Sequence, residues 1–276
     1  MNTTDPEIPS RGPSPGLLLR EWRNRRRMSQ LDLALEAEIS QRHLSFVESG
    51  RAMPSRDMVL RLSERLEVPL RERNRILLAA GFAPGFSERP VDDPSLGAAM
   101  KAVELVLAGH EPNPAIAVDR RWNLVSANGA IAPFLEGIED ASLLEPPLNV
   151  LRLSLHPRGL APRIVNFVDW RDHILERLRR LNDHVADPGL HALEEELRTY
   201  PAPRRTGPSR LDYSAIAVPL RMRMGDEVLS FISTITVFGT PLDVTLSELA
   251  VESFFAADGR TTEILRVMAA ARSGGG

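Results

Sequence analysis

Two short amphipathic segments joined by a tight turn, within residues 28–51, constrain the fold of this chain more than any other feature. In the first segment, Ser29 is placed to cap a helix, and Asp32 three residues later completes a capping box. Ser40 is placed to cap a second helix, and Gly50 follows that helix at the position where glycine commonly ends one. The pattern therefore predicts a helix-turn-helix.

The side chains that this pattern leaves on the outside of the second helix are suited to reading DNA. Gln41 can bond to N6 and N7 of adenine, and Arg42 to O6 and N7 of guanine. Ser45 and Phe46 lie on the same side, although Phe46 is alternatively a core residue. The residues expected to contact phosphate are Ser29, Gln30, Ser40 and Arg51. The residues predicted to contact bases are Gln41, Arg42, Ser45 and Phe46.

Charge is unevenly distributed along the chain. The net charge is −3, yet residues 17–81 carry 13 arginines against 9 acidic residues, whereas residues 82–276 carry 20 basic against 26 acidic ones. The basic surplus coincides with the helix-turn-helix, as attraction to phosphate requires.

Hydrophobic periodicity predicts five helices in the first 81 residues, which together make a small all-α bundle. The expected helices are Leu17–Arg27, Met28–Glu38, Gln41–Ser49, Arg56–Leu66 and Arg71–Ala80. A proline-rich polar stretch follows and reads as a linker. We therefore expect a disordered arm over residues 1–15, a DNA-binding domain over 16–82, a linker over 83–95 and a second domain over 96–272.

The second domain mixes helical and strand patterns. Two hairpins are expected: Pro114–Val118 with Trp122–Ala127, and Ser214–Met224 with Glu227–Phe238. Leu246–Phe255 is a candidate third strand beside the second hairpin. A flexible loop is expected over residues 201–208. The expected helices are Leu96–Ala108, Asn128–Leu135, Phe167–Val185, Gly189–Tyr200 and Thr261–Ala271. This order predicts an α+β domain with an antiparallel sheet.

The first 81 residues resemble the helix-turn-helix of the phage-repressor and xenobiotic-response-element class, with its five-helix lambda-repressor-like bundle. The resemblance includes Ala34 at the helix crossing and Gly50-Arg51 after the second helix. It implies that Arg23 pairs with Glu48. One departure is Glu38, which occupies a left-handed turn position that usually holds glycine, at a cost of about 1 kcal/mol.

The remainder, from about residue 90 to 272, resembles the ligand-binding domain of MmyB-like regulators, a branch of the same class. One stretch that matches this branch lies earlier, within residues 43–84, HLSFVESGRAMPSRDMVLRLSERLEVPLRERNRILLAAGFAP. The stretches that match in the remainder are AIAVDRRWNLVSAN, LHPRGLAPRIVNF and STITVFGTPLDVTLSELAVESFFAAD. The resemblance implies a PAS-like sensor domain and an association with fatty-acid-like molecules. It also implies a DNA-binding transcriptional regulator.

Candidate ligand-binding residues in the PAS-like domain are large aromatics and a few polar side chains. The aromatics can line a sensory pocket, and Arg163 is suited to binding a carboxylate. The same aromatics are alternatively ordinary core, and the polar residues structural. The candidates are Trp122, Asn128, Phe134, His156, Arg163, Phe167, Trp170, Phe231 and Phe238.

Several classes of function are disfavoured by what the sequence lacks. It has no cysteine and no histidine spacing typical of a metal site, so we expect no metal. It lacks the motifs of nucleophilic hydrolases, dinucleotide enzymes and phosphate-binding loops, so we expect no catalysis and no cofactor. No signal peptide or membrane span is recognisable, which predicts a cytoplasmic protein.

We expect a homodimer on a palindromic DNA operator, because one reading helix contacts only a few base pairs. Two alternatives stay open for the second domain. It can bind no small molecule and instead contact RNA polymerase or another protein, or it can be a PAS-like sensor of haem or flavin.

Overall fold

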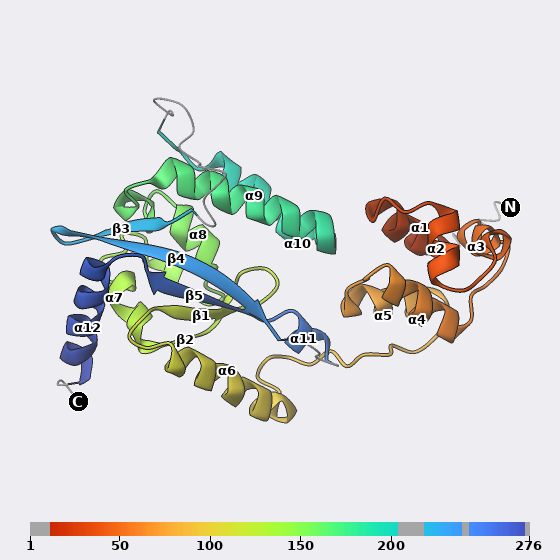
Figure 1. The fold of residues 1–276 in the computed structure, drawn as a ribbon, viewed down its shortest axis with the longest axis horizontal. Helices are drawn as coiled ribbons and strands as arrows, with labels where there is room; N and C mark the ends of the chain where they lie inside the picture. The colour runs from red at the N-terminus through yellow and green to blue at the C-terminus, as the bar shows by residue number, and fades with distance from the viewer. Residues whose placement is uncertain (1–11, 204–217, 239–242, 274–276) are drawn as a thin grey trace, which may run out of the picture. The chain divides into compact units, whose positions relative to one another are not determined.

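The structure is a computed structural model that describes residues 12–203, 218–238 and 243–273, and its chain forms two compact units (Figure 1). Among the described residues, 12–88 with 243–244 make up one unit, and 89–203, 218–238 and 245–273 make up the other. Most of the expected arm, residues 1–11, lies outside the described residues. The two units are described separately below.

Between residues 12 and 88 the chain forms five α-helices, which confirms the predicted bundle. A serine caps each of the first four: Ser14, Ser29, Ser40 and Ser55. At Ser29 both bonds of the capping box are present, at 3.1 and 3.0 Å. The helices are α1 Pro15–Arg25, α2 Gln30–Glu36, α3 Gln41–Glu48, α4 Arg56–Arg65 and α5 Leu70–Ala79.

Each of these five helices is followed by a residue with a left-handed backbone. Two are glycines, Gly50 at φ 73° and Gly81 at φ 83°. The other three are Arg27 at φ 56°, Glu38 at φ 56° and Glu67 at φ 48°. The left-handed conformation expected for Glu38 is confirmed. Because a side chain opposes this conformation, the three non-glycine positions each cost about 1 kcal/mol.

The bundle is held together by close packing of α1 on α3. Leu19, Leu33 and Leu44 are fully buried in its core. At Gly16, in the first turn of α1, a Cβ atom would lie 2.0 Å from the carbonyl oxygen of Val47 in α3. The two helices can therefore approach this closely only with glycine at position 16.

The second unit is built on one five-stranded antiparallel sheet in the order β2-β1-β5-β4-β3 (Figure 1). Two hairpins, β1-β2 and β3-β4, flank β5, which pairs with both of them. The antiparallel α+β fold is confirmed. The strands are β1 Ala115–Val118, β2 Leu124–Ala127, β3 Leu220–Met224, β4 Glu227–Val237 and β5 Ala250–Ala256.

Different helices cover the two faces of this sheet (Figure 1). Helix α6 packs on the face that presents Ala115, Ala117 and Val251. The opposite face presents Ile116 and Phe231 toward α8 and α9. Helices α9 and α10 pack against each other. The helices of this unit are α6 Gly97–Gly109, α7 Ala132–Leu135, α8 Val150–Leu155, α9 Phe167–Val185, α10 Pro188–Thr199, α11 Val244–Ser247 and α12 Gly259–Ser273.

Two sequence-based elements differ from the structure. The expected strand Leu246–Phe255 is shorter, because α11 occupies its start and pairing with β1 and β4 begins only at Ala250. The expected helix Asn128–Leu135 is a 3₁₀ turn followed by the single turn α7. The first residues expected in strand Ser214–Met224 and the end of the 201–208 loop lie outside the described residues.

Helix α8 is not expected from the sequence, because its six residues are too few to show a helical period. Asn149 caps this helix by accepting a bond from the amide of Arg152 at 3.0 Å. Leu151, Leu153 and Leu155 are all buried. Helix α8 thus belongs to the core of the second unit.

We predict that Gly16→Ala destabilises the helix-turn-helix unit by about 1–3 kcal/mol, because the added methyl group forces α1 and α3 apart. Gly97→Ala is the matched control, since that glycine also lies in the first turn of a helix but has no atom within 4 Å of the Cβ position. Differential scanning calorimetry of both variants measures the effect. Equal unfolding temperatures would contradict the packing argument.

Candidate functional site

Helix α3 carries the residues that the sequence predicts to read bases. Gln41 and Arg42, in its first turn, are exposed, and Ser45 and Phe46 one turn later are half-buried. The guanidinium carbons of Arg42 and Arg51 lie 5.4 and 5.9 Å from the centre of the Phe46 ring. Phe46 therefore lies under two arginines at the surface, outside the buried core.

Three of the four expected phosphate-binding residues, Ser29, Gln30 and Ser40, lie at the starts of α2 and α3, and Arg51 follows the end of α3. The Ser29 hydroxyl accepts from the amide of Asp32, and the Ser40 hydroxyl accepts from the amide of His43 at 3.1 Å. Both hydroxyl groups thus cap helices. Gln30 donates from Nε2 to Oε2 of Glu48 at 2.7 Å, so its side chain is tied to α3.

A buried ion pair fixes α3 against α1. Arg23 donates from Nε and Nη2 to the two carboxylate oxygens of Glu48, at 2.7 and 2.9 Å, and from Nη1 to the carbonyl of Met28 at 2.8 Å. The side chains are only 10% and 2% exposed. Bonding to Glu48 raises the pKa of Arg23 above its usual value. The pairing implied by the family resemblance is confirmed, and it holds α3 in place against α1.

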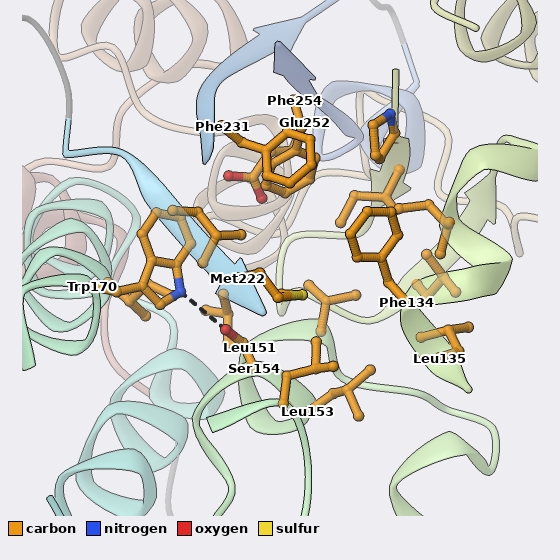
Figure 2. Close-up of a pocket in the computed structure, with 18 of the residues that line it drawn as sticks. Phe134, Leu135, Leu151, Leu153, Ser154, Trp170, Met222, Phe231, Glu252 and Phe254 are labelled. Carbon is orange, nitrogen blue, oxygen red and sulfur yellow. Dashed lines mark hydrogen bonds between the residues drawn. The ribbon is translucent and has the colours of Figure 1, made fainter. Parts of the chain in front are cut away.

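The second unit contains an apolar cavity between the sheet and helices α7, α8 and α9 (Figure 2). Measured as the space open to the centre of a water-sized molecule, its volume is about 100 Å³. One water needs roughly 10–15 Å³ by that measure, so the cavity has room for a small apolar molecule. Lining residues include Leu135, Leu151, Leu153, Ser154, Met222 and Phe254.

Three of the nine residues predicted to bind a ligand line this cavity: Phe134 from α7, Trp170 from α9 and Phe231 from β4. Figure 2 shows Trp170 and Phe134 on opposite sides of it. Trp170 donates from Nε1 to the hydroxyl of Ser154 at 3.0 Å, which satisfies its one polar group and fixes the ring.

The polar candidates lie elsewhere, because each bonds to its own surroundings. Asn128 accepts from the amide of Ala115 and donates to two carbonyls, which ties β1 to the end of α6. His156 packs edge-on against Tyr200. Arg163 donates to the carbonyl oxygens of Phe134 and Glu136 at 2.9 and 3.1 Å, so its guanidinium braces backbone.

The other three aromatic candidates are also outside the cavity lining. Phe167 is buried in the main core of the unit. Phe238 packs with a second core cluster, on the α6 face of the sheet. Trp122 is buried directly beneath Arg177, with the guanidinium carbon 4.2 Å from the centre of its ring.

Two charged residues that line the cavity, Arg177 on α9 and Glu252 on β5, were not among the predicted ligand-binding residues. Arg177 donates from Nη1 to Oε1 of Glu252 at 2.8 Å, and their side chains are 18% and 4% exposed. The position of Arg177 in the sequence could have identified it. It lies seven residues after Trp170, which places both on the buried side of an amphipathic helix. Glu252 likewise interrupts an apolar strand.

A five-helix helix-turn-helix bundle that exposes Gln41 and Arg42 on its second helix, in one chain with a domain built around an apolar cavity, defines a DNA-binding transcription regulator with a ligand-binding domain. Residues 19–73 match a helix-turn-helix family, and residues 99–268 match the MmyB-like transcription regulator ligand binding domain. The chain therefore belongs to the MmyB-like transcription regulators. These are regulatory families and not catalytic ones. A search of curated protein sequences found no match.

Within the described ranges no helix combines the length and apolarity that crossing a membrane requires. In the same ranges no three histidine, aspartate or glutamate side chains are grouped as metal ligands.

We predict that Arg23→Met destabilises the helix-turn-helix unit by about 3–5 kcal/mol, because it leaves the buried charge of Glu48 unpaired. The double variant Arg23→Met with Glu48→Leu should lose less stability, since it leaves no buried charge without a partner. Hydrogen exchange of peptides from α1 and α3 measures the change. In the control Arg75→Met, which removes an exposed pair with Glu72, exchange should hardly change. If Arg23→Met protects α1 and α3 from hydrogen exchange as well as the double variant does, the stranded charge of Glu48 is not the cause of the instability.

Proposed function

We propose that this regulator binds a specific DNA sequence through α3 and responds to a fatty-acid-like molecule held in the cavity of its second domain. The observation that carries the DNA half of the proposal is the exposure of Gln41 and Arg42 in the first turn of a capped helix. Side chains at that position of a recognition helix are the ones that reach base edges in the major groove.

The other proposed DNA contacts follow from their place around α3. Ser45 and Phe46 lie one turn further along, where a hydroxyl can bond to a base edge and a ring can press on a thymine methyl. Ser29, Gln30 and Ser40 lie at the starts of α2 and α3, where backbone amides attract phosphate, and Arg51 adds a cation after the end of α3.

We propose that the protein binds as a homodimer to a palindromic operator, through the domain over residues 96–272. A single α3 spans too few base pairs to provide specificity, whereas two copies reading half-sites about 10 base pairs apart multiply both affinity and specificity.

The proposed ligand class rests on the composition of the cavity. Its walls are leucine, isoleucine, methionine and aromatic side chains, and its few polar groups include the Arg177–Glu252 pair. A largely apolar site with few placed polar groups is typical of a site for a small apolar ligand. An amphiphile with a short polar head and an alkyl chain fits this pattern.

We predict that Arg42→Ala weakens binding to the operator by about 1–3 kcal/mol and leaves binding to unrelated DNA nearly unchanged, because it removes base contacts. The operator is first obtained by selection from a random DNA library, and both affinities are measured by fluorescence anisotropy. Arg180→Ala, an exposed arginine of the second unit, serves as the control and should change neither affinity. Equal losses on both DNAs would refute the base-reading role of Arg42.

We also predict that the purified protein binds saturated fatty acids, as seen by native mass spectrometry and isothermal titration calorimetry. Leu135→Trp narrows the cavity and should weaken binding at least about tenfold, whereas Leu105→Trp, at an exposed position on α6, should not. A protein that binds no acid from octanoic to hexadecanoic would refute the proposed ligand class and favour a domain that contacts another protein.

A further inference from the structure

The guanidinium of Arg177 lines the apolar cavity and is only partly bonded. Its Nη1 donates to Glu252, but its buried Nε and Nη2 have no hydrogen-bond partner among the described residues. Buried donors without acceptors cost free energy, because water no longer satisfies them. Two such donors on one arginine, at the wall of a cavity, indicate a site for an acceptor that the chain itself does not supply.

The shape of these two donors selects the acceptor. Nε and Nη2 form one edge of the guanidinium plane, and their spacing matches the two oxygens of a carboxylate. The same edge holds carboxylates elsewhere in this chain. Arg23 uses it for Glu48 at 2.7 and 2.9 Å, and Arg152 uses it for Glu196 at 2.6 and 2.7 Å.

The orientation of Arg177 is already fixed. Trp122 lies 4.2 Å beneath the guanidinium carbon, and Glu252 holds Nη1 from β5. The guanidinium is therefore held in place before binding, which favours affinity. Its Nε and Nη2 are covered from water, so the side chains beside them must shift before a headgroup can bond to this edge. Among the described residues that line the cavity, Arg177 is also the only cation.

We propose that Arg177 is the anchor for the terminal carboxylate of an amphiphilic ligand, which bonds to Nε and Nη2 while its alkyl chain lies among the leucines of α8. This inference rests on the proposed function of the cavity and names the headgroup and the residue that selects it. Glu252 has the opposite influence. Its negative charge already balances Arg177 and repels a second carboxylate, so it limits the affinity.

The test compares dodecanoic acid with 1-dodecanol, which have the same alkyl chain but differ in the headgroup, by isothermal titration calorimetry on the full chain. The wild-type protein should prefer the acid by about tenfold or more, the effect of charge-assisted hydrogen bonds. In the double variant Arg177→Gln with Glu252→Gln the preference should fall to about one, with the affinity for the alcohol retained. Glu252→Gln alone should strengthen binding of the acid only.

The double variant is chosen because Arg177→Gln alone would strand the buried charge of Glu252 and could unfold the domain. Its control is Arg152→Gln with Glu196→Gln, which removes a pair bonded through the same arginine edge at a site outside the cavity lining. This control should keep the preference for the acid.

Two results would overturn the inference in distinguishable ways. If the wild type binds acid and alcohol equally, or if the double variant keeps its preference for the acid, Arg177 is not the anchor, while the proposed ligand class stands. If neither compound binds the wild type, the proposed ligand class fails and this inference fails with it.

Discussion

The ligand-binding domain depends on one strand, β5, which joins two hairpins that otherwise share no pairing. It pairs with β1 from Ala115 to Val118 on one side and with β4 from Phe231 to Val237 on the other. It also contributes Glu252 and Phe254 to the cavity. Because β5 lies near the end of the chain and its partner β1 more than a hundred residues earlier, the sheet and its cavity form only through long-range contacts, which are slow to assemble.

The helix-turn-helix unit could be predicted closely because its signals are local. The serine caps, the apolar period and the glycine after α3 each act within a few residues, and the helices begin and end within two residues of the expected positions. The pair between Arg23 and Glu48 joins residues 25 positions apart. It came only from the family resemblance, since no local pattern identifies it.

The cavity could not be predicted to the same degree, because its lining is chosen by register and packing. The pairing of β5 opposite Ile116 decides that Glu252 and not its neighbours faces the cavity. Arg177 reaches it across 75 positions. Residue type alone favoured Arg163 as the residue that binds a ligand carboxylate, but its guanidinium donates to backbone carbonyls instead. The predicted aromatic residues were partly informative, since three of the six line the cavity and the other three pack in the cores of the same unit.

The left-handed residues that follow the five helices of the DNA-binding unit affect how this protein can change over evolution. At Arg27, Glu38 and Glu67 the unit forgoes the stability that glycine would give at these turns. These positions belong neither to the buried core nor to the face of α3 proposed to read bases. Substitution there can raise or lower the stability of the bundle without changing the DNA sequence that it prefers. Related proteins can therefore adapt to new temperatures while their operator sequences stay the same.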